Sequence, residues 1–69
     1  MNNEELENLF RYHTPNEDQI VKYKRIREKA FEIAMLILET TPPSADQDTA
    51  IRKLRECVMT ANASIAIGG

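Results

Sequence analysis

The positions of the helix-breaking residues constrain this chain more than any other feature. Its three prolines stand at 15, 42 and 43, and its two glycines are the last two residues. Proline ends a helix and disfavours helical backbone at the residue before it, so the prolines divide the chain into three segments. Each segment has apolar residues with helical periodicity. The sequence therefore predicts an all-α fold, with helices over about residues 3–12, 17–40 and 45–67.

A capping pair stands at the start of each predicted helix. In such a pair, an Asn or Ser precedes Glu or Gln by three residues, and side chains and backbone satisfy the free amides of the first turn. A left-handed C-cap glycine is expected at Gly68, after the last apolar residues. The capping pairs are Asn2 with Glu5, Asn16 with Gln19, and Ser44 with Gln47.

The two long segments have apolar residues at alternating spacings of three and four, which is typical of a seam between packed helices. With a tight turn at Pro42-Pro43, we expect an antiparallel αα-hairpin some 30–35 Å long, and a short N-terminal helix packed along it. All of it forms a single domain, 1–69. Cys57 falls within the seam and is interpreted as a buried small apolar residue. The seam residues are Tyr23, Ile26, Ala30, Ile33 and Ile37, and Ile51, Leu54, Val58, Ala61 and Ile65.

The size of the chain predicts self-association. Domains below roughly 70–80 residues usually need disulfides, a metal or an oligomeric partner. This chain has 69 residues with one Cys and one His, too few for an internal disulfide or a typical four-ligand metal site. Yet 42% of its residues are hydrophobic and 29% are charged, an ordinary globular balance. We therefore expect a homo-oligomer without a metal or another cofactor.

A second apolar edge on the first long helix points to where the subunits meet. On a helical wheel its residues widen the apolar arc to roughly 200°, more than one partner helix and a short helix can cover. Phe31 and Met35 contact either the N-terminal helix or another subunit, and we favour the subunit. Arg27 lies within this arc, and its charge needs either a Glu or Asp of another helix or a ligand. The edge comprises Ile20, Phe31, Met35 and Leu38.

Five of the nine basic residues lie within eight positions, although the net charge is −2. A solvated face with ion pairs to Glu28 and Glu32 accounts for three of them. Lys24 and Arg27 project toward the apolar edge and fit that interpretation less well. The five are Lys22, Lys24, Arg25, Arg27 and Lys29.

Several classes of function are disfavoured. The negative net charge and the absence of a long basic stripe argue against DNA binding. No apolar run approaches the ~20 residues of a membrane span, and the acidic N-terminus does not resemble a signal or transit peptide. Pairs such as Glu4 and Glu5 stand on an exposed first turn without the burial that tunes catalytic carboxylates. We expect a soluble intracellular protein that is not an enzyme.

The junction before Pro15 concentrates residues that could contact a base. Two of the four aromatic residues, Phe10 and Tyr12, occupy it beside His13. Aromatic rings stack on bases, and an imidazole titrates near neutral pH. The other interpretation is a hydrophobic plug at the hairpin end, with His13 capping the C-terminus of the first helix.

Taken in order, these residues resemble a known family. The chain is similar over nearly its whole length to the small phage hairpin domain of the anti-CBASS cyclic-nucleotide sponges, and a related hairpin occurs in Thoeris anti-defence sponges. The resemblance rests on Phe10-x-Tyr12-His13-x-Pro15, Gln19, Tyr23-x-x-Ile26-Arg27-x-x-Ala30, a Pro-Ser pair, and Val58-Met59-x-Ala61-Asn62-Ala63-x-Ile65-Ala66.

The resemblance implies a homohexamer in the cytoplasm of the infected bacterial host. It would sequester cyclic oligonucleotide messengers without cleaving them and so block CBASS signalling. The expected ligands are cyclic dinucleotides such as cyclic GMP-AMP, bound between protomers, with cyclic trinucleotides at a separate site in some relatives. Tyr12 would stack on a purine, Arg27 would hold phosphate with Lys24 as a second candidate, and His13 and Pro15 would shape the loop.

Two departures from the family pattern qualify this expectation. Thr60 stands where many relatives have Trp, so packing there must differ. The chain ends Ile67-Gly68-Gly69 where many relatives end in a basic residue, which puts a trinucleotide site in doubt. The alternative function is a small helical oligomerisation or adaptor protein with no nucleotide ligand.

Overall fold

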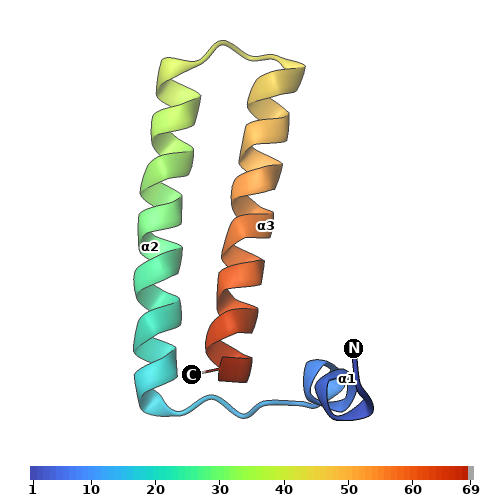
Figure 1. Cartoon of the computed structure of the whole chain (residues 1–69). Helices are drawn as coiled ribbons and strands as arrows, with labels where there is room; N and C mark the ends of the chain where they lie inside the picture. Colours follow the sequence, from blue (N-terminus) through green and yellow to red (C-terminus); the bar gives the residue numbers. More distant parts are fainter. Residues whose placement is uncertain (69) are drawn as a thin grey trace.

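The computed structural model describes residues 1–68, and all its secondary structure there is helical. Helix α1 spans Asn3–Phe10, α2 spans Glu17–Thr40 and α3 spans Ala45–Gly68. Helices α2 and α3 run antiparallel as a hairpin, and α1 lies beside the end where α2 begins and α3 ends (Figure 1). The predicted all-helical hairpin with a short N-terminal helix is confirmed.

Two predicted helix ends are wrong. Helix α1 ends at Phe10, not near Tyr12, because Arg11 already has extended backbone with φ −77° and ψ 142°. The residues up to Asn16 form an extended linker that leads into Pro15. Helix α3 includes Gly68, and no glycine within residues 1–68 has a positive φ, so the left-handed C-cap is not formed there. Gly69 lies outside the described residues.

All three capping pairs form, but only one of them has both of the hydrogen bonds of a capping box among the described residues. Asn16 and Gln19 form the full reciprocal box: the Gln19 amide donates to Asn16 Oδ1 at 2.8 Å, and the Asn16 amide donates to Gln19 Oε1 at 3.0 Å. Asn2 Oδ1 accepts from the Glu5 amide at 2.7 Å, and Ser44 Oγ accepts from the Gln47 amide at 3.1 Å. All three helix starts are therefore determined locally.

Two glutamines are the only buried residues in the described part of the chain, at 8% exposure for Gln19 and 9% for Gln47. Gln19 Nε2 donates to the carbonyl oxygen of Ile65 at 3.1 Å and so joins the start of α2 to the last turns of α3. Gln47 Nε2 donates to the carbonyl oxygen of Thr41 at 3.0 Å and to its hydroxyl at 3.1 Å. One glutamine thus closes each end of the hairpin.

The seam between α2 and α3 is half-buried, and no apolar residue among residues 1–68 is fully buried. Two assignments to it are wrong. Ile33 is 48% exposed and Cys57 is exposed, because both lie on the flank of the seam. A strict heptad repeat drifts by about 20° per seven residues on a straight α-helix, which places Ile33 at the end of the apolar arc. Cys57 directly precedes the seam residue Val58, so it points about 100° away from it.

Helix α1 does not pack along the hairpin, contrary to expectation. Its apolar residues Leu6 and Leu9 are 47% and 48% exposed, and it stands to one side of the hairpin end (Figure 1). On α2, Phe31 and Met35 are 66% and 43% exposed. The interpretation in which α1 of the same chain covers this edge is therefore wrong, and the edge is open in the single chain.

None of the three described helices combines the length and the apolar content needed to cross a bilayer.

Candidate functional site

The linker between α1 and α2 presents Tyr12 to solvent. The Tyr12 side chain is 83% exposed, as is that of Phe10. The linker leaves α1 with extended backbone at Arg11 and contains Pro15, itself exposed, whose φ is fixed by its ring. A ring displayed in this way is free to stack on a planar ligand.

His13 is engaged within the chain. Its ring is half-buried, and Nε2 lies 2.8 Å from the carbonyl oxygen of Asn8. Because a carbonyl can only accept, Nε2 carries the hydrogen and donates it. Asn8 lies in the last turn of α1, so this bond agrees with the interpretation of His13 as a cap of that helix.

Replacing His13 with alanine is expected to loosen α1 more than it destabilises the hairpin. One partly exposed hydrogen bond contributes about 0.5–1.5 kcal/mol, so the melting temperature should fall by less than about 10 °C. Cleavage by a nonspecific protease between residues 10 and 16 should become faster. Thr14→Ala is a matched control in the same linker, and equal cleavage of both variants would contradict the capping role.

Arg27 lies on α2 in a shallow hollow of about 470 Å³ with Phe31, Glu28 and Glu32. It forms no ion pair within residues 1–68, where the pairs are Lys22–Asp18, Lys24–Glu28 and Lys29–Glu32. The exposed Phe31 ring supplies an apolar wall beside the guanidinium. Arg27 therefore has donors available for an anion outside its own chain, although two carboxylates share the hollow.

Lys24 is held only loosely. Its Nζ lies 3.9 Å from Glu28 Oε1, and the two side chains are 66% and 60% exposed. Exposed pairs of this kind contribute little to stability, typically below about 1 kcal/mol. Lys24 can therefore turn to another anion at small cost.

The single chain does not bring the predicted residues together. The hollow at Arg27 contains α2 residues alone, and none from the linker. Arg27 stands ten positions beyond the start of α2, about 15 Å along the helix axis. The linker instead runs across the end of the hairpin toward α1 (Figure 1). One chain thus presents an exposed aromatic ring on the linker and, separately, a cation on α2.

Asn62 on α3 has a buried polar atom that the sequence analysis did not predict. Asn62 Oδ1 is buried without a hydrogen-bond partner among the described residues, on an otherwise half-buried side chain of α3. Asn62 belongs to the Val58–Ala66 motif by which the chain resembles the family, but the motif did not predict a role for this side chain. A buried acceptor without a hydrogen-bond donor is uncommon in folded proteins.

The described residues contain no group of three or more His, Cys, Asp or Glu arranged to hold a metal ion.

The chain matches a known protein family. The family model described as Acb2/Tad1, hairpin domain, matches residues 2–66. Among curated proteins and among solved structures, none matches the chain. The family match covers α1, the linker, α2, α3 as far as residue 66, and all five candidate residues.

Proposed function

Because the chain belongs to the Acb2/Tad1 hairpin family, we propose that it binds and sequesters cyclic oligonucleotide second messengers without cleaving them. The observation that carries this proposal is the family match over residues 2–66, which includes every predicted site residue. The proposed ligands are cyclic dinucleotides such as cyclic GMP-AMP. The proposed setting is the cytoplasm of an infected bacterium, where removing the messenger blocks CBASS signalling.

The chemistry of a cyclic dinucleotide fits the exposed Tyr12 ring and the Arg27 guanidinium. Such a ligand has two phosphates and two flat bases, so its pocket needs cations and stacking surfaces. Tyr12 offers an exposed ring, and Arg27 offers a guanidinium without an ion pair in residues 1–68. Lys24 is the second cation, and His13 and Pro15 shape the linker that carries Tyr12.

We propose that the complete site forms between protomers of a homo-oligomer, with six subunits as the expected number. The separation of Tyr12 from Arg27 in one chain supports this, because a neighbouring copy can supply the missing half. The open apolar edge at Phe31 and Met35 provides surface for such a contact. A trinucleotide site is not part of the proposal, since the C-terminal departure from the family pattern includes Gly69, outside the described residues.

Titration calorimetry with cyclic GMP-AMP tests the function directly. We expect saturable binding with a dissociation constant well below about 10 μM, since tighter binding is what sequestration requires. Intact nucleotide should be recovered after the protein is denatured. Linear pGpA is the matched control ligand, because it has the same two bases but no ring.

The outcomes separate the candidate functions. No heat at tens of micromolar across a panel of cyclic di- and trinucleotides would refute the sponge function. A mass near one subunit, or a complex only with another protein, would favour the adaptor alternative. Recovery of hydrolysed nucleotide would instead identify a nuclease.

A further inference from the structure

The side chain of Gln19 joins the linker to both long helices. Its Oε1 accepts from the amide of Asn16, the last residue before α2, at 3.0 Å, and its Nε2 donates to the carbonyl oxygen of Ile65 on α3 at 3.1 Å. The side chain is 8% exposed and uses both ends of its carboxamide, so it cannot rotate without breaking a hydrogen bond. Gln19 therefore connects the end of the linker to the last turns of α3.

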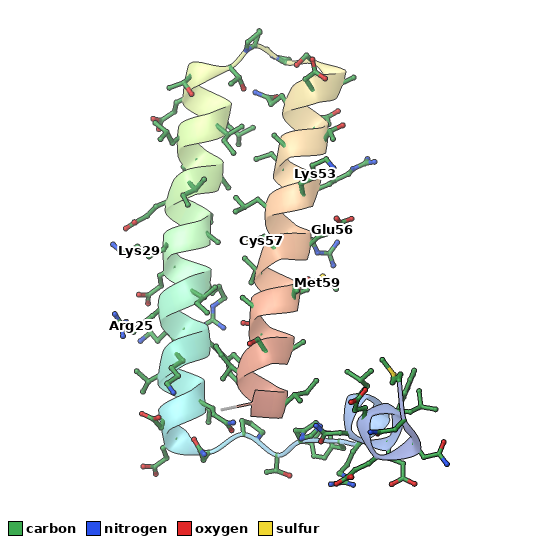
Figure 2. The ribbon with its side chains drawn as sticks, in the orientation of Figure 1. Arg25, Lys29, Lys53, Glu56, Cys57 and Met59 are labelled. Atoms are coloured by element: carbon green, nitrogen blue, oxygen red, sulfur yellow. The ribbon has the colours of Figure 1, made fainter. Side chains whose placement is uncertain are left out.

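Polar contacts between α2 and α3 are scarce along the rest of the hairpin. The ion pairs among residues 1–68 all join residues within α2. In Figure 2, Arg25 and Lys29 extend outward from α2, away from α3. Within residues 1–68, the bond from Gln19 to Ile65 is the side-chain hydrogen bond that joins α2 to α3. The direction of the first turn of α2 relative to α3 thus depends on half-buried apolar packing and on this bond.

The linker that carries Tyr12 is held at both of its ends. On the α1 side, His13 Nε2 donates to the carbonyl oxygen of Asn8 at 2.8 Å. On the α2 side, the reciprocal capping box holds Asn16. Pro15 lies between these contacts, and its ring fixes its φ. Few backbone torsions of the linker remain free, so its direction follows that of the first turn of α2.

A small change in that direction has a large effect on the aromatic ring. Tyr12 lies four residues before Asn16, at most about 14 Å of extended chain from it, so a tilt of about 10° at Asn16 moves Tyr12 by roughly 2 Å. A binding group has to be held within about 0.5 Å and 10–20° of its productive geometry. The proposed site combines Tyr12 of one copy with Arg27 of another, so the direction of the linker decides whether the two meet.

We propose that Gln19 is a positioning residue for nucleotide binding. Its hydrogen bond to Ile65 fixes the direction in which the linker leaves the hairpin, and thereby the place of the Tyr12 ring. Because Gln19 is nearly buried, it acts through Tyr12 and not by contact with the ligand. This inference rests on the proposed function and deepens it, since it names the residue that orders the aromatic part of the site.

Gln19→Glu tests the bond to α3 without removing the cap. Glutamate is a common partner in capping boxes and still accepts from the Asn16 amide, but an ionised carboxylate has no hydrogen to donate to Ile65. The matched control is Gln47→Glu, the same substitution at 9% exposure and at the opposite end of the hairpin. It removes the donor to Thr41 and leaves the linker untouched.

Calorimetry with cyclic GMP-AMP distinguishes positioning from a general loss of stability. Both variants should melt at a lower temperature than the wild type. Gln19→Glu should bind about tenfold more weakly, because the apparent affinity falls with the fraction of chains whose linker has the competent direction. Gln47→Glu should bind within about twofold of the wild type. Equal affinities of the two variants would show that Gln19 serves stability alone and would overturn the inference.

A double-mutant cycle tests whether Gln19 acts through the ring. In a Tyr12→Ala background, Gln19→Glu should weaken binding by less than about threefold, because the group that it positions is already absent. The same tenfold loss in both backgrounds would show that Gln19 acts independently of Tyr12 and would also overturn the inference.

Backbone order in the linker is measured without nucleotide. Order parameters from ¹⁵N relaxation for residues 11–14 should fall below about 0.6 in Gln19→Glu, and should stay higher in the wild type and in Gln47→Glu. The measurement is made well below the melting temperature of each variant. Equal order parameters in all three proteins would contradict the inference. Absence of binding by the wild type would refute the proposed function instead, and the order parameters would then still decide whether Gln19 fixes the linker.

Discussion

Replacing Arg27 with alanine is expected to weaken cyclic GMP-AMP binding by about 10- to 100-fold, since a hydrogen bond to a charged group contributes about 1.5–3 kcal/mol. Arg27 forms no ion pair in residues 1–68, so its loss leaves no carboxylate of the chain newly unpaired. Arg27→Lys should have an intermediate effect, because it keeps the charge but loses the bidentate fork. Calorimetry at one fixed salt concentration measures both.

The controls separate the site from the assembly. Arg52→Ala removes an exposed cation from α3 and should leave the affinity unchanged. Tyr12→Ala should also weaken binding by about tenfold or more, whereas Tyr12→Phe keeps the stacking face and should bind nearly as well. All of these variants should keep the oligomeric mass of the wild type. Normal binding by both Arg27→Ala and Tyr12→Ala would show that the site lies elsewhere, even if the chain binds nucleotide.

Replacing Gln19 with leucine is expected to lower stability more than most single changes in this chain. Gln19 bonds the Asn16 amide and the Ile65 carbonyl, and it links two helix ends that are 46 positions apart in sequence. Losing two such bonds at a nearly buried site costs about 2–3 kcal/mol, or roughly 10–20 °C in melting temperature for a domain of this size. Thermal melts by circular dichroism should be compared at one protein concentration, because assembly stabilises the fold by mass action.

Two further variants make the Gln19 result interpretable. Gln47→Leu should cost less, because the bonds of Gln47 to Thr41 close a turn within six positions. Thr60→Ala changes an exposed polar residue of α3 and should melt close to the wild type. A Gln19→Leu variant that melts within about 2 °C of the wild type would show that the link to Ile65 does not hold the hairpin closed.

Much of the fold was predictable because its signals are local. Proline positions, three capping pairs and the apolar repeat predicted three helices, and residues 1–68 contain three. The wrong predictions concern features that a local sequence pattern does not determine. Helix α1 ends early because Arg11 is extended, and Cys57 is exposed because the straight helix turns it to the flank of the seam.

The candidate site was only partly predictable. Residue types and family motifs identified Tyr12 and Arg27 as an aromatic ring and a cation suited to a nucleotide. Their separation within one chain was not visible in the pattern, because it depends on the path of the linker past α3. The sequence pattern also predicted that Arg25 belongs to a solvated face with ion pairs. In the structure, Arg25 has no ion pair among the described residues and lies at the edge of an apolar groove between α2 and α3.

The helices of this protein follow from the amino-acid order alone, because a helix forms through bonds between residues four apart and ends at residues that cannot make them. Which helix faces are covered depends instead on contacts between residues far apart in sequence. Within residues 1–68 those contacts bury two glutamines and leave α1, the α2 edge and the groove between α2 and α3 open. That uncovered surface, on a chain of only 69 residues, supports our proposal that the protein assembles with further copies of itself.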